Sequence, residues 1–282
     1  MIYGTPAAFR MALEARLASS SREVGVDLNR LRRRVVFEQA LLRLDGTQPG
    51  RWVLKGGMAL EIRWRDRARA TRDLDLAVRD GACDQDGLRS LLAGALELDP
   101  HGDWFQFAVG SARALTVDAA GRPGWRFPVE AHLAGRQFAQ FTTDIVLRAE
   151  EIGGTERIPL PGLLAFAGLP TATVEIVDRN QHFAEKLHAL TQTYGDRPNT
   201  RIRDLVDLLM LVEDGLPASN ELAARVRHVF AVRSTHSIPT ALSDPPHFWA
   251  EGYSTLASEL DVEAKTLNDA MKSLRAFWAL VP

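Results

Sequence analysis

The segment from residue 52 to residue 78 constrains the fold of this 282-residue chain more than any other. It opens with an apolar run, Trp52-Val53-Leu54, that predicts a short buried strand, and the pair Gly56-Gly57 predicts a tight turn. Residues 58–64 favour a helix, and residues 73–78 alternate in the manner of a half-buried strand. A strand, a turn, a helix and a second strand in this order indicate a mixed α/β architecture.

Helices and further strands are expected on both sides of this segment. Thr5 and Asp27 are suited to cap two opening helices, and Asp84 is suited to cap a helix that runs to about Leu98. A stretch rich in proline and glycine covers residues 158–170. Further strands are predicted over residues 104–109, 126–133, 138–147 and 174–177.

Beyond Asp178 the pattern is almost wholly helical. Apolar residues recur at helical spacing, with Thr200 as one predicted cap and Asp261 as the start of the last helix. We therefore expect the fold class α+β (mixed α/β), with a small mixed sheet flanked by helices and a helical C-terminal domain. The predicted domains are residues 1–177 and 178–282, and the second is expected to complete a cleft on the first.

The composition limits the partners and the location of the protein. The formal net charge is −2, so a surface for nucleic acid would have to be local. No apolar stretch reaches the roughly 20 residues of a membrane span, and charged residues such as Arg10 and Glu14 interrupt any signal-peptide core. The single cysteine, Cys83, is expected to be a reduced thiol. These features predict a cytoplasmic protein without membrane contact.

Two aspartates on one predicted strand give the strongest indication of chemistry. Asp73 and Asp75 lie two residues apart, so their carboxylates project from the same face. Mg²⁺ prefers such oxygen ligands together with substrate phosphates. Upstream, Gly56-Gly57 would place backbone N–H groups at a helix N-terminus, where they bind phosphate. The combination predicts nucleotidyl transfer, because the metal neutralises a triphosphate and the turn orients it.

A two-metal site usually needs a third carboxylate on a neighbouring strand. Asp144 is the preferred candidate, because it lies inside the otherwise apolar run 138–147, where an unpaired acid is costly. The alternative for Asp144 is a carboxylate that is simply solvated or paired to an arginine. Glu130, which also lies in a predicted strand, is the rival for the role.

The densest basic run of the chain lies between the glycine pair and Asp73. Arginine binds phosphate bidentately, so this run could hold a triphosphate or the backbone of an acceptor RNA. A solvated loop is the alternative interpretation. The run contains Arg63, Arg65, Arg67, Arg69 and Arg72.

Three motifs occur in a specific order over roughly residues 50 to 210. The first is Gly56-Gly57-x-Ala59-Leu60 followed by Thr71-Arg72-Asp73-Leu74-Asp75-Leu76, and the second is Glu185-Lys186-Leu187-His188-Ala189. The third is Arg201-Ile202-Arg203-Asp204-Leu205-Val206-Asp207-Leu208. Together they resemble the AbiEii/AbiGii toxin family of nucleotidyltransferases, within the wider DNA-polymerase-β-like superfamily. The implied fold is the nucleotidyltransferase type, with a small mixed sheet flanked by helices.

The resemblance assigns roles to matched residues. Without it, Lys186 fits an ordinary surface lysine, and Asp204 and Asp207 fit helix ion pairs with neighbouring arginines; Asp207 is interpreted as structural. Met58 stands where many relatives carry serine or threonine, so a hydroxyl contact to the nucleotide is expected to be missing. The candidate site consists of the catalytic residues Asp73, Asp75, Lys186 and Asp204, the phosphate-binding residues Lys55, Gly56, Gly57 and Arg72, and the metal ligands Asp73, Asp75 and Asp144.

Other residues that often carry chemistry are interpreted as structural. His182 and His188 lie six residues apart on one predicted helix, so they do not share a face and are not expected to bind a metal. The aromatic residues of the C-terminal region are expected to pack in the core rather than to stack on bases. They are Trp249, Phe277 and Trp278.

The resemblance also implies a function. The expected enzyme is a toxin of a toxin–antitoxin or abortive-infection system that transfers NMP from an NTP to an acceptor hydroxyl, with Mg²⁺ or Mn²⁺ as cofactor. The implied acceptor is the 3′ end of tRNA, whose modification blocks translation, and the implied protein partner is a cognate antitoxin. The alternatives are a protein or small-molecule acceptor for the same chemistry, or a catalytically weak module that binds a nucleotide or a partner.

Overall fold

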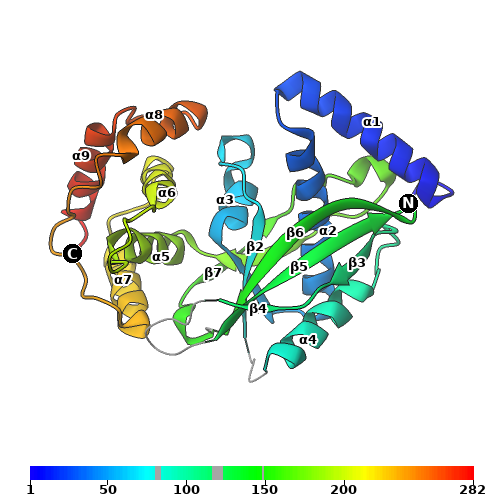
Figure 1. Cartoon of the computed structure of the whole chain (residues 1–282), viewed down its shortest axis with the longest axis horizontal. Helices are drawn as coiled ribbons and strands as arrows, with labels where there is room; N and C mark the ends of the chain where they lie inside the picture. The colour runs from blue at the N-terminus through cyan, green and yellow to red at the C-terminus, as the bar shows by residue number, and fades with distance from the viewer. Residues whose placement is uncertain (80–83, 116–122, 148) are drawn as a thin grey trace.

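A mixed β-sheet with its covering helices forms the first part of the structure, and a group of helices forms the second (Figure 1). This computed structural model describes residues 1–79, 84–115, 123–147 and 149–282. Cys83, the expected reduced thiol, lies outside the described residues. The expected mixed α/β fold class is confirmed.

The helices and strands have the following bounds. The helices are α1 (Pro6–Val24), α2 (Leu28–Thr47), α3 (Gly56–Trp64), α4 (Gln85–Glu97), α5 (Arg179–Thr191), α6 (Ile202–Glu213), α7 (Asn220–Arg233), α8 (Trp249–Glu259) and α9 (Leu267–Trp278). The strands are β1 (Trp52–Lys55), β2 (Asp73–Val78), β3 (Gln106–Val109), β4 (Arg113–Ala114), β5 (Gly124–Leu133), β6 (Arg136–Val146), β7 (Thr155–Pro159) and β8 (Thr173–Val177).

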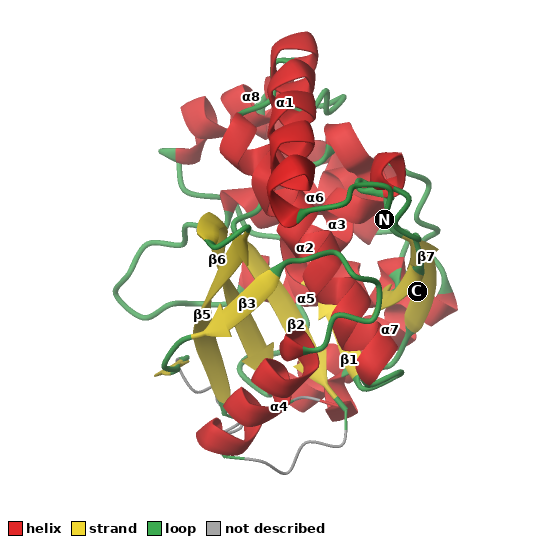
Figure 2. Ribbon diagram, turned by 90° about the vertical axis from the view of Figure 1, so that its right-hand side faces the viewer, coloured by secondary structure: helices red, strands yellow, loops and turns green. Residues whose placement is uncertain are grey.

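The described strands form one sheet in the order β3-β5-β6-β2-β1-β8-β7, with β4 paired to β5. The β2/β6 and β1/β8 pairs are parallel, and the other pairs are antiparallel. In Figure 2 α1 rises above the sheet, α2 runs alongside the strands, and α4 crosses the lower end of the sheet. The register matters for the site, because Asp75 on β2 pairs with Lys55 on β1 and with Asp144 on β6.

Several helix starts follow the sequence prediction, and others do not. Thr5 and Asp27 cap α1 and α2, and each side chain accepts a backbone N–H three residues ahead. Thr200 was expected to cap α6, but the cap position is Arg201, without a side-chain hydrogen bond. Asp261 was expected to open α9 and instead has a φ of +52°, so the helix begins later, behind Thr266.

Two strands of the sheet were not expected from the sequence. Strand β4 is only two residues long. Strand β7 lies at the edge of the sheet and ends at Pro159. An edge strand tolerates proline because its outer N–H groups are not needed for pairing. The proline at the end of this edge strand is therefore the reason that the sequence pattern predicts a loop there.

Buried apolar side chains form two clusters. One lies among α1, α2, α4 and the sheet, and the other lies among the helices from α5 to α9 together with Leu60 of α3. Trp249 and Phe277 belong to the second cluster, and Trp278 packs against it, as expected. The division of the chain at residue 177 stays a prediction. Within the described ranges, none of the helices is long and apolar enough to cross a membrane.

Candidate active site

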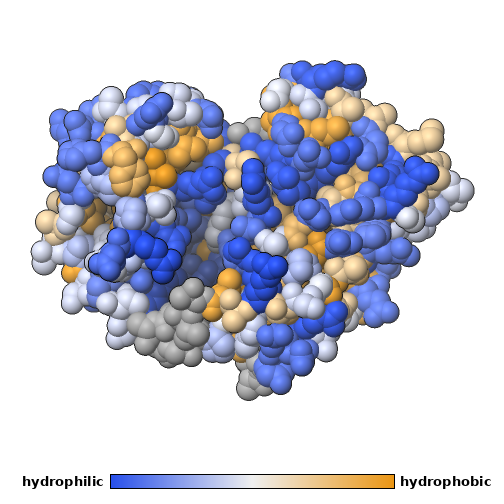
Figure 3. Space-filling view, in the orientation of Figure 1, coloured by the Kyte–Doolittle hydropathy of each residue, from blue (hydrophilic) through white to orange (hydrophobic). Residues whose placement is uncertain are grey.

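A cavity of about 280 Å³ opens between the strand ends of β1, β2 and β6 and the helices α5 and α6. The space-filling view shows a hollow between the two halves of the molecule, bordered by hydrophilic side chains (Figure 3). Of the nine residues predicted for the site, six line this cavity: Lys55, Gly56, Asp75, Asp144, Lys186 and Asp204. The sheet register and the helical motifs thus bring together residues up to about 150 positions apart in the sequence (Lys55 and Asp204).

The carboxylate of Asp75 lies at the centre of the acidic group. Burial raises its pKa to about 6, and the charge of Asp144 adds to this effect, while Lys186 and Lys55 oppose it. Asp73, two residues earlier on β2, accepts a hydrogen bond from the Thr142 hydroxyl. Three carboxylates therefore share one end of the β2/β6 pair, and their repulsion is only partly compensated by the two lysines.

Asp144 has a cationic partner on the next strand. Arg126 on β5 pairs with it in register and binds both carboxylate oxygens, at 2.7 and 2.6 Å. The Arg126 side chain is 44% exposed, so solvent screens this ion pair on its outer side. Glu130, the rival third carboxylate, pairs with His132 and does not line the cavity. Of the two candidates, only Asp144 lies beside Asp75.

No complete metal site is already assembled in the described part of the chain. Within it, no group of three or more histidine, cysteine, aspartate or glutamate side chains is arranged to hold a metal ion. The nearest approach to one is the acidic group of Asp73, Asp75 and Asp144, in which Asp144 is held by Arg126 and Asp73 by Thr142. The assignment of these residues to a metal stays a prediction.

The glycine pair was expected to form a tight turn, but it forms the first turn of α3. Gly56 has a φ of +63°, and a Cβ at this position would overlap the carboxylate of Asp75. A Cβ on Gly57 would approach the hydroxyl of Thr71 to 2.9 Å. The absence of side chains therefore lets the helix N-terminus lie directly against Asp75. Met58 is buried in the apolar core and does not line the cavity, so its side chain faces away from the site.

Replacing Gly56 with alanine is expected to reduce nucleotidyl transfer at least about a hundredfold, because the new methyl group displaces Asp75. The left-handed backbone adds a stability loss of about 1–2 kcal/mol. Gly50 is a matched control, since it has a φ of +73° and open space around it. Gly50→Ala should show the same loss in thermal unfolding with unchanged transfer. Equal activity of the two variants would contradict the assigned role of Gly56.

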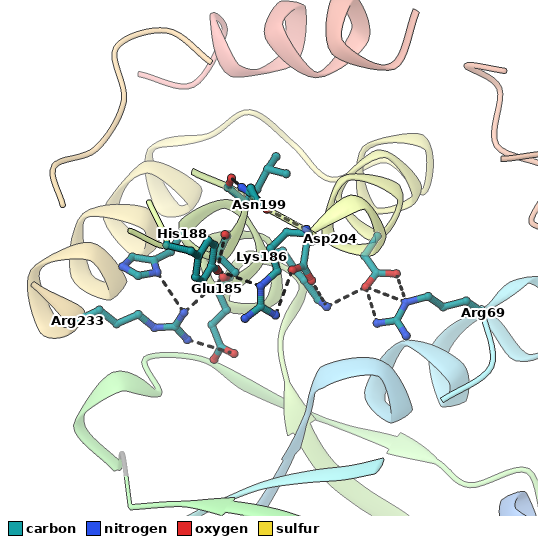
Figure 4. Close-up of polar contacts among 12 residues, drawn as sticks. Arg69, Glu185, Lys186, His188, Asn199, Asp204 and Arg233 are labelled. Carbon is teal, nitrogen blue, oxygen red and sulfur yellow. Dashed lines mark hydrogen bonds and ion pairs between the residues drawn. The ribbon is translucent and has the colours of Figure 1, made fainter. Parts of the chain in front are cut away.

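Lys55 was predicted to bind phosphate, and its ammonium group lies in the cavity wall with acidic partners. Its Nζ is 2.9 Å from Glu185 on α5 and 3.5 Å from Glu151. Arg233 of α7 also binds Glu151, at 2.6 Å, and approaches Glu185 at 3.7 Å (Figure 4). Lys55 therefore joins the sheet to the helical part of the chain through a buried ionic cluster.

Lys186 lies between two aspartates of α6. Its Nζ is 2.7 Å from Asp204 and 2.8 Å from Asp207 (Figure 4). Burial favours the neutral amine, but the two carboxylates outweigh it and raise the pKa of Lys186, which keeps the group charged. Asp204 also lies 3.7 Å from Arg201 at the cavity rim. The lysine is thus a fixed cation on the cavity wall and not a surface side chain.

Asp207 lies behind Lys186 and does not line the cavity. Arg69 binds both of its carboxylate oxygens, with the closest contact at 2.9 Å. Burial alone would raise the pKa of Asp207, but Lys186 and Arg69 lower it to about 2. The alternative of a surface ion pair with a neighbouring arginine of the same helix is wrong for Asp207, because its side chain is buried and binds Arg69 and Lys186. The structural interpretation of Asp207 fits these contacts.

The arginine run is divided between structural and exposed residues. Arg69 binds Asp207, and Arg63 binds Glu156 at 2.8 Å, so these two side chains hold elements together. Arg65, Arg67 and Arg72 are exposed, and none of them lines the cavity. A solvated loop is therefore the better description of part of the run. The phosphate-binding role of Arg72 stays a prediction.

Four polar or charged residues of the cavity wall were not among the predicted site residues. Glu185 and Arg233 belong to the ionic cluster of Lys55, Arg201 lies at the rim, and His182 lies one helical turn before Lys186. Glu185 and Arg201 are part of the matched motifs, and the helical spacing of His182 and Lys186 could have placed both on one face. Arg233 carries no local signal, since its partners are distant in sequence.

The cavity brings the carboxylates of Asp75 and Asp144, the first turn of α3 and the Lys186 ammonium to one place, and the sequence comparison gives the class of protein, a nucleotidyltransferase. The sequence model described as "Nucleotidyl transferase AbiEii toxin, Type IV TA system" matches residues 39–279, and the chain belongs to this family. Membership implies, in general terms, a nucleoside triphosphate substrate and an antitoxin partner.

Solved structures of low sequence identity also align with the chain. A protein from H. pylori described as a nucleotidyltransferase is 16% identical, with a TM-score of 0.46, covering 91% of this chain and 96% of that chain. An antigenic nucleotidyltransferase-like protein from Paracoccidioides brasiliensis is 13% identical, with a TM-score of 0.42, covering 80% of this chain and 91% of that chain. Among curated proteins, none matches the chain.

Proposed function

We propose that this chain transfers a nucleoside monophosphate from an NTP to an acceptor hydroxyl, with release of pyrophosphate, and that the acceptor is the 3′ end of tRNA. The observation that carries the transfer is the cavity in which Asp75, Asp144, Gly56 and Lys186 meet. Carboxylates, a helix N-terminus and a fixed cation are the groups that position a triphosphate for in-line displacement.

The acidic group fits a divalent cation. Mg²⁺ and Mn²⁺ take carboxylate oxygens, and Asp75 lies beside Asp144 in a place where desolvation, together with repulsion by Asp144, raises the pKa of Asp75 to about 6. We assign Asp73, Asp75 and Asp144 as the residues that hold the metal. When bound, the metal neutralises phosphate charge and activates the attacking hydroxyl. Arg126, whose side chain is 44% exposed, would share or give up Asp144 when a metal binds.

The remaining groups orient the nucleotide. The N-terminus of α3 at Gly56 presents backbone N–H groups to phosphate oxygens, and the absence of a side chain keeps this approach open. Lys186 supplies a positive charge that Asp204 and Asp207 hold in place. We assign Lys186 the role of stabilising the negative charge that develops on the phosphates during transfer.

The acceptor is the less direct part of the proposal. The tRNA end is the acceptor that the resemblance of the motifs implies, and the exposed arginines Arg65, Arg67 and Arg72 lie on the segment that leads into β2. Such side chains provide sequence-independent affinity for an RNA backbone. An antitoxin partner follows from the toxin–antitoxin family and not from any surface of this chain.

The proposal is tested by incubating the full chain with each labelled NTP, Mg²⁺ or Mn²⁺, and total tRNA. We expect the label to appear in tRNA, and comparison of the four NTPs identifies the one that is preferred. Two controls are matched to the mechanism: tRNA whose 3′ diol has been oxidised by periodate, and the Asp75→Ala variant. Neither should be labelled. Label in protein with none in RNA contradicts the tRNA acceptor and supports a protein acceptor for the same chemistry.

A further inference from the structure

His182 on α5 is a buried polar residue whose ring makes no hydrogen bond to the part of the chain that the structure describes. Its side chain is wholly covered, and neither ring nitrogen has a hydrogen-bond partner among the described residues. His188, on the same helix, is also buried, but its Nδ1 meets Arg233 at 3.4 Å and its Nε2 meets the Thr235 hydroxyl at 2.8 Å. The described residues thus supply hydrogen-bond partners to both ring nitrogens of His188 and to neither ring nitrogen of His182.

An imidazole in this situation destabilises the fold. A buried donor or acceptor that loses its water and gains no partner carries the full penalty of desolvation. An apolar side chain at residue 182 would avoid this penalty, because the neighbouring Phe183 and Leu187 are packed in an apolar cluster. A polar side chain at a position where an apolar one would be more stable points to a partner other than the described residues of the folded chain.

The position of His182 shows where such a partner would lie. His182, Glu185, Lys186 and Ala189 follow one face of α5 at helical spacing, and all four line the active-site cavity. Gly56, at the N-terminus of α3, and Lys55 line the same cavity. The unpartnered ring therefore lies in the wall that faces the groups best suited to phosphate.

The surrounding charges fix the form of the ring. Burial lowers the pKa of His182 well below its usual value, and Lys186, Arg63 and Lys55 lower it further, against the opposing effect of Asp207. A neutral imidazole carries one N–H donor and one acceptor nitrogen. In a wall that also holds Lys55 and Lys186, the ligand group that fits the N–H donor is an anionic oxygen.

We propose that His182 is a substrate-binding residue that donates a ring N–H to an oxygen of the phosphates that leave as pyrophosphate. This inference rests on the proposed function, because it specifies how the same cavity holds the NTP. It also explains the missing partner, since the nucleotide supplies it. The ring is covered by its neighbours, so binding requires the cavity wall to adjust around the phosphate.

The test compares His182→Leu, which removes the donor, with His182→Gln, which keeps an N–H donor. For each, thermal unfolding is measured without nucleotide, and the dissociation constants of NTP and of the matching NMP are measured by calorimetry. We expect His182→Leu to unfold at the same or a higher temperature and to bind NTP about tenfold or more weakly, with NMP binding changed less than about twofold. His182→Gln should recover part of the NTP affinity. His247→Leu, at an exposed histidine, is the control and should change none of these values.

Other outcomes overturn the inference in distinct ways. A lower unfolding temperature of His182→Leu without a selective loss of NTP affinity assigns His182 to the fold alone. Equal weakening of NTP and NMP places its contact away from the leaving phosphates. Wild-type protein that binds NTP but labels no acceptor contradicts the proposed function, while the binding comparison still decides the role of His182. Wild-type protein that binds no NTP contradicts both.

Discussion

Asp75→Asn is expected to abolish transfer and, in the absence of metal, to make the chain more stable at pH 8. The loss of activity should be about a thousandfold or more, because the variant removes the central charge of the proposed metal and phosphate site. The gain in stability has a different cause. The ionised carboxylate of the half-buried Asp75 is partly desolvated and is also repelled by Asp144, and asparagine removes both costs.

The direction of the pH dependence follows from the pKa of Asp75. Folding raises this pKa from 3.8 to about 6, so the folded chain binds a proton that the unfolded chain has released between these values. The associated stability is present below pH 4 and is lost as the pH rises through about 6. The loss amounts to at most about 3 kcal/mol. Wild type and Asp75→Asn should therefore differ little at pH 4 and most at pH 8.

Denaturant unfolding from pH 4 to pH 8 in the presence of a chelator measures this difference. Asp261→Asn is the control, because the Asp261 side chain is 91% exposed and its removal should change neither the stability profile nor transfer. Addition of Mg²⁺ should stabilise the wild type at pH 8 and leave Asp75→Asn unaffected. If Asp75→Asn is less stable than wild type at pH 8, the carboxylate is not under the repulsion described above.

The sheet part of the site could be predicted from the sequence because its signal is local. Strict alternation over residues 73–78 places Asp73 and Asp75 on one face, and strand β2 has these bounds. The apolar run around Asp144 gives a second strand, although the sequence does not say that β6 lies beside β2. Lys186 and Asp204 were included in the candidate site because of the family motifs. Helical spacing alone does not distinguish a buried lysine from a lysine on the surface.

The partners of these residues could not be predicted in the same way. Arg126, Glu185 and Arg233 act through contacts that span large sequence separations, and a charged residue carries no local mark of its partner. His182 was expected to be a structural residue and not a metal ligand, because it does not share a helix face with His188. Its importance is visible only when the burial of the ring and the lack of contacts are both known. The predicted start of a helix was wrong where the chain forms a loop before the helix begins, as at Asp261.

Asp207→Asn is expected to lower the unfolding free energy by about 3–5 kcal/mol, since it breaks a buried ion pair from one side. Asp207 is 1% exposed and binds Arg69 and Lys186, which lose a common counter-ion in the variant. The pKa of Asp207 is about 2, below its unfolded value, so its contribution is present above about pH 4 and is lost as the pH falls toward 2. Transfer should fall as well, because Lys186 is then held by Asp204 alone.

Two comparisons separate this buried network from ordinary surface charge. Asp214→Asn breaks the exposed pair between Arg179 and Asp214 near the end of α6, and it should change stability by less than about 1 kcal/mol. The double variant Arg69→Met/Asp207→Asn should lose less unfolding free energy than the sum of the losses of its two single variants, by about 0.5–3 kcal/mol. The reason is that each single change leaves the other charge of the pair without this partner. Strict additivity in chemical denaturation would show that Arg69 and Asp207 act independently. If the transfer rate follows the unfolding free energy across all these variants, Asp207 contributes to stability alone. If fully folded Asp207→Asn protein transfers more slowly than wild type, Asp207 also holds Lys186 in position for transfer.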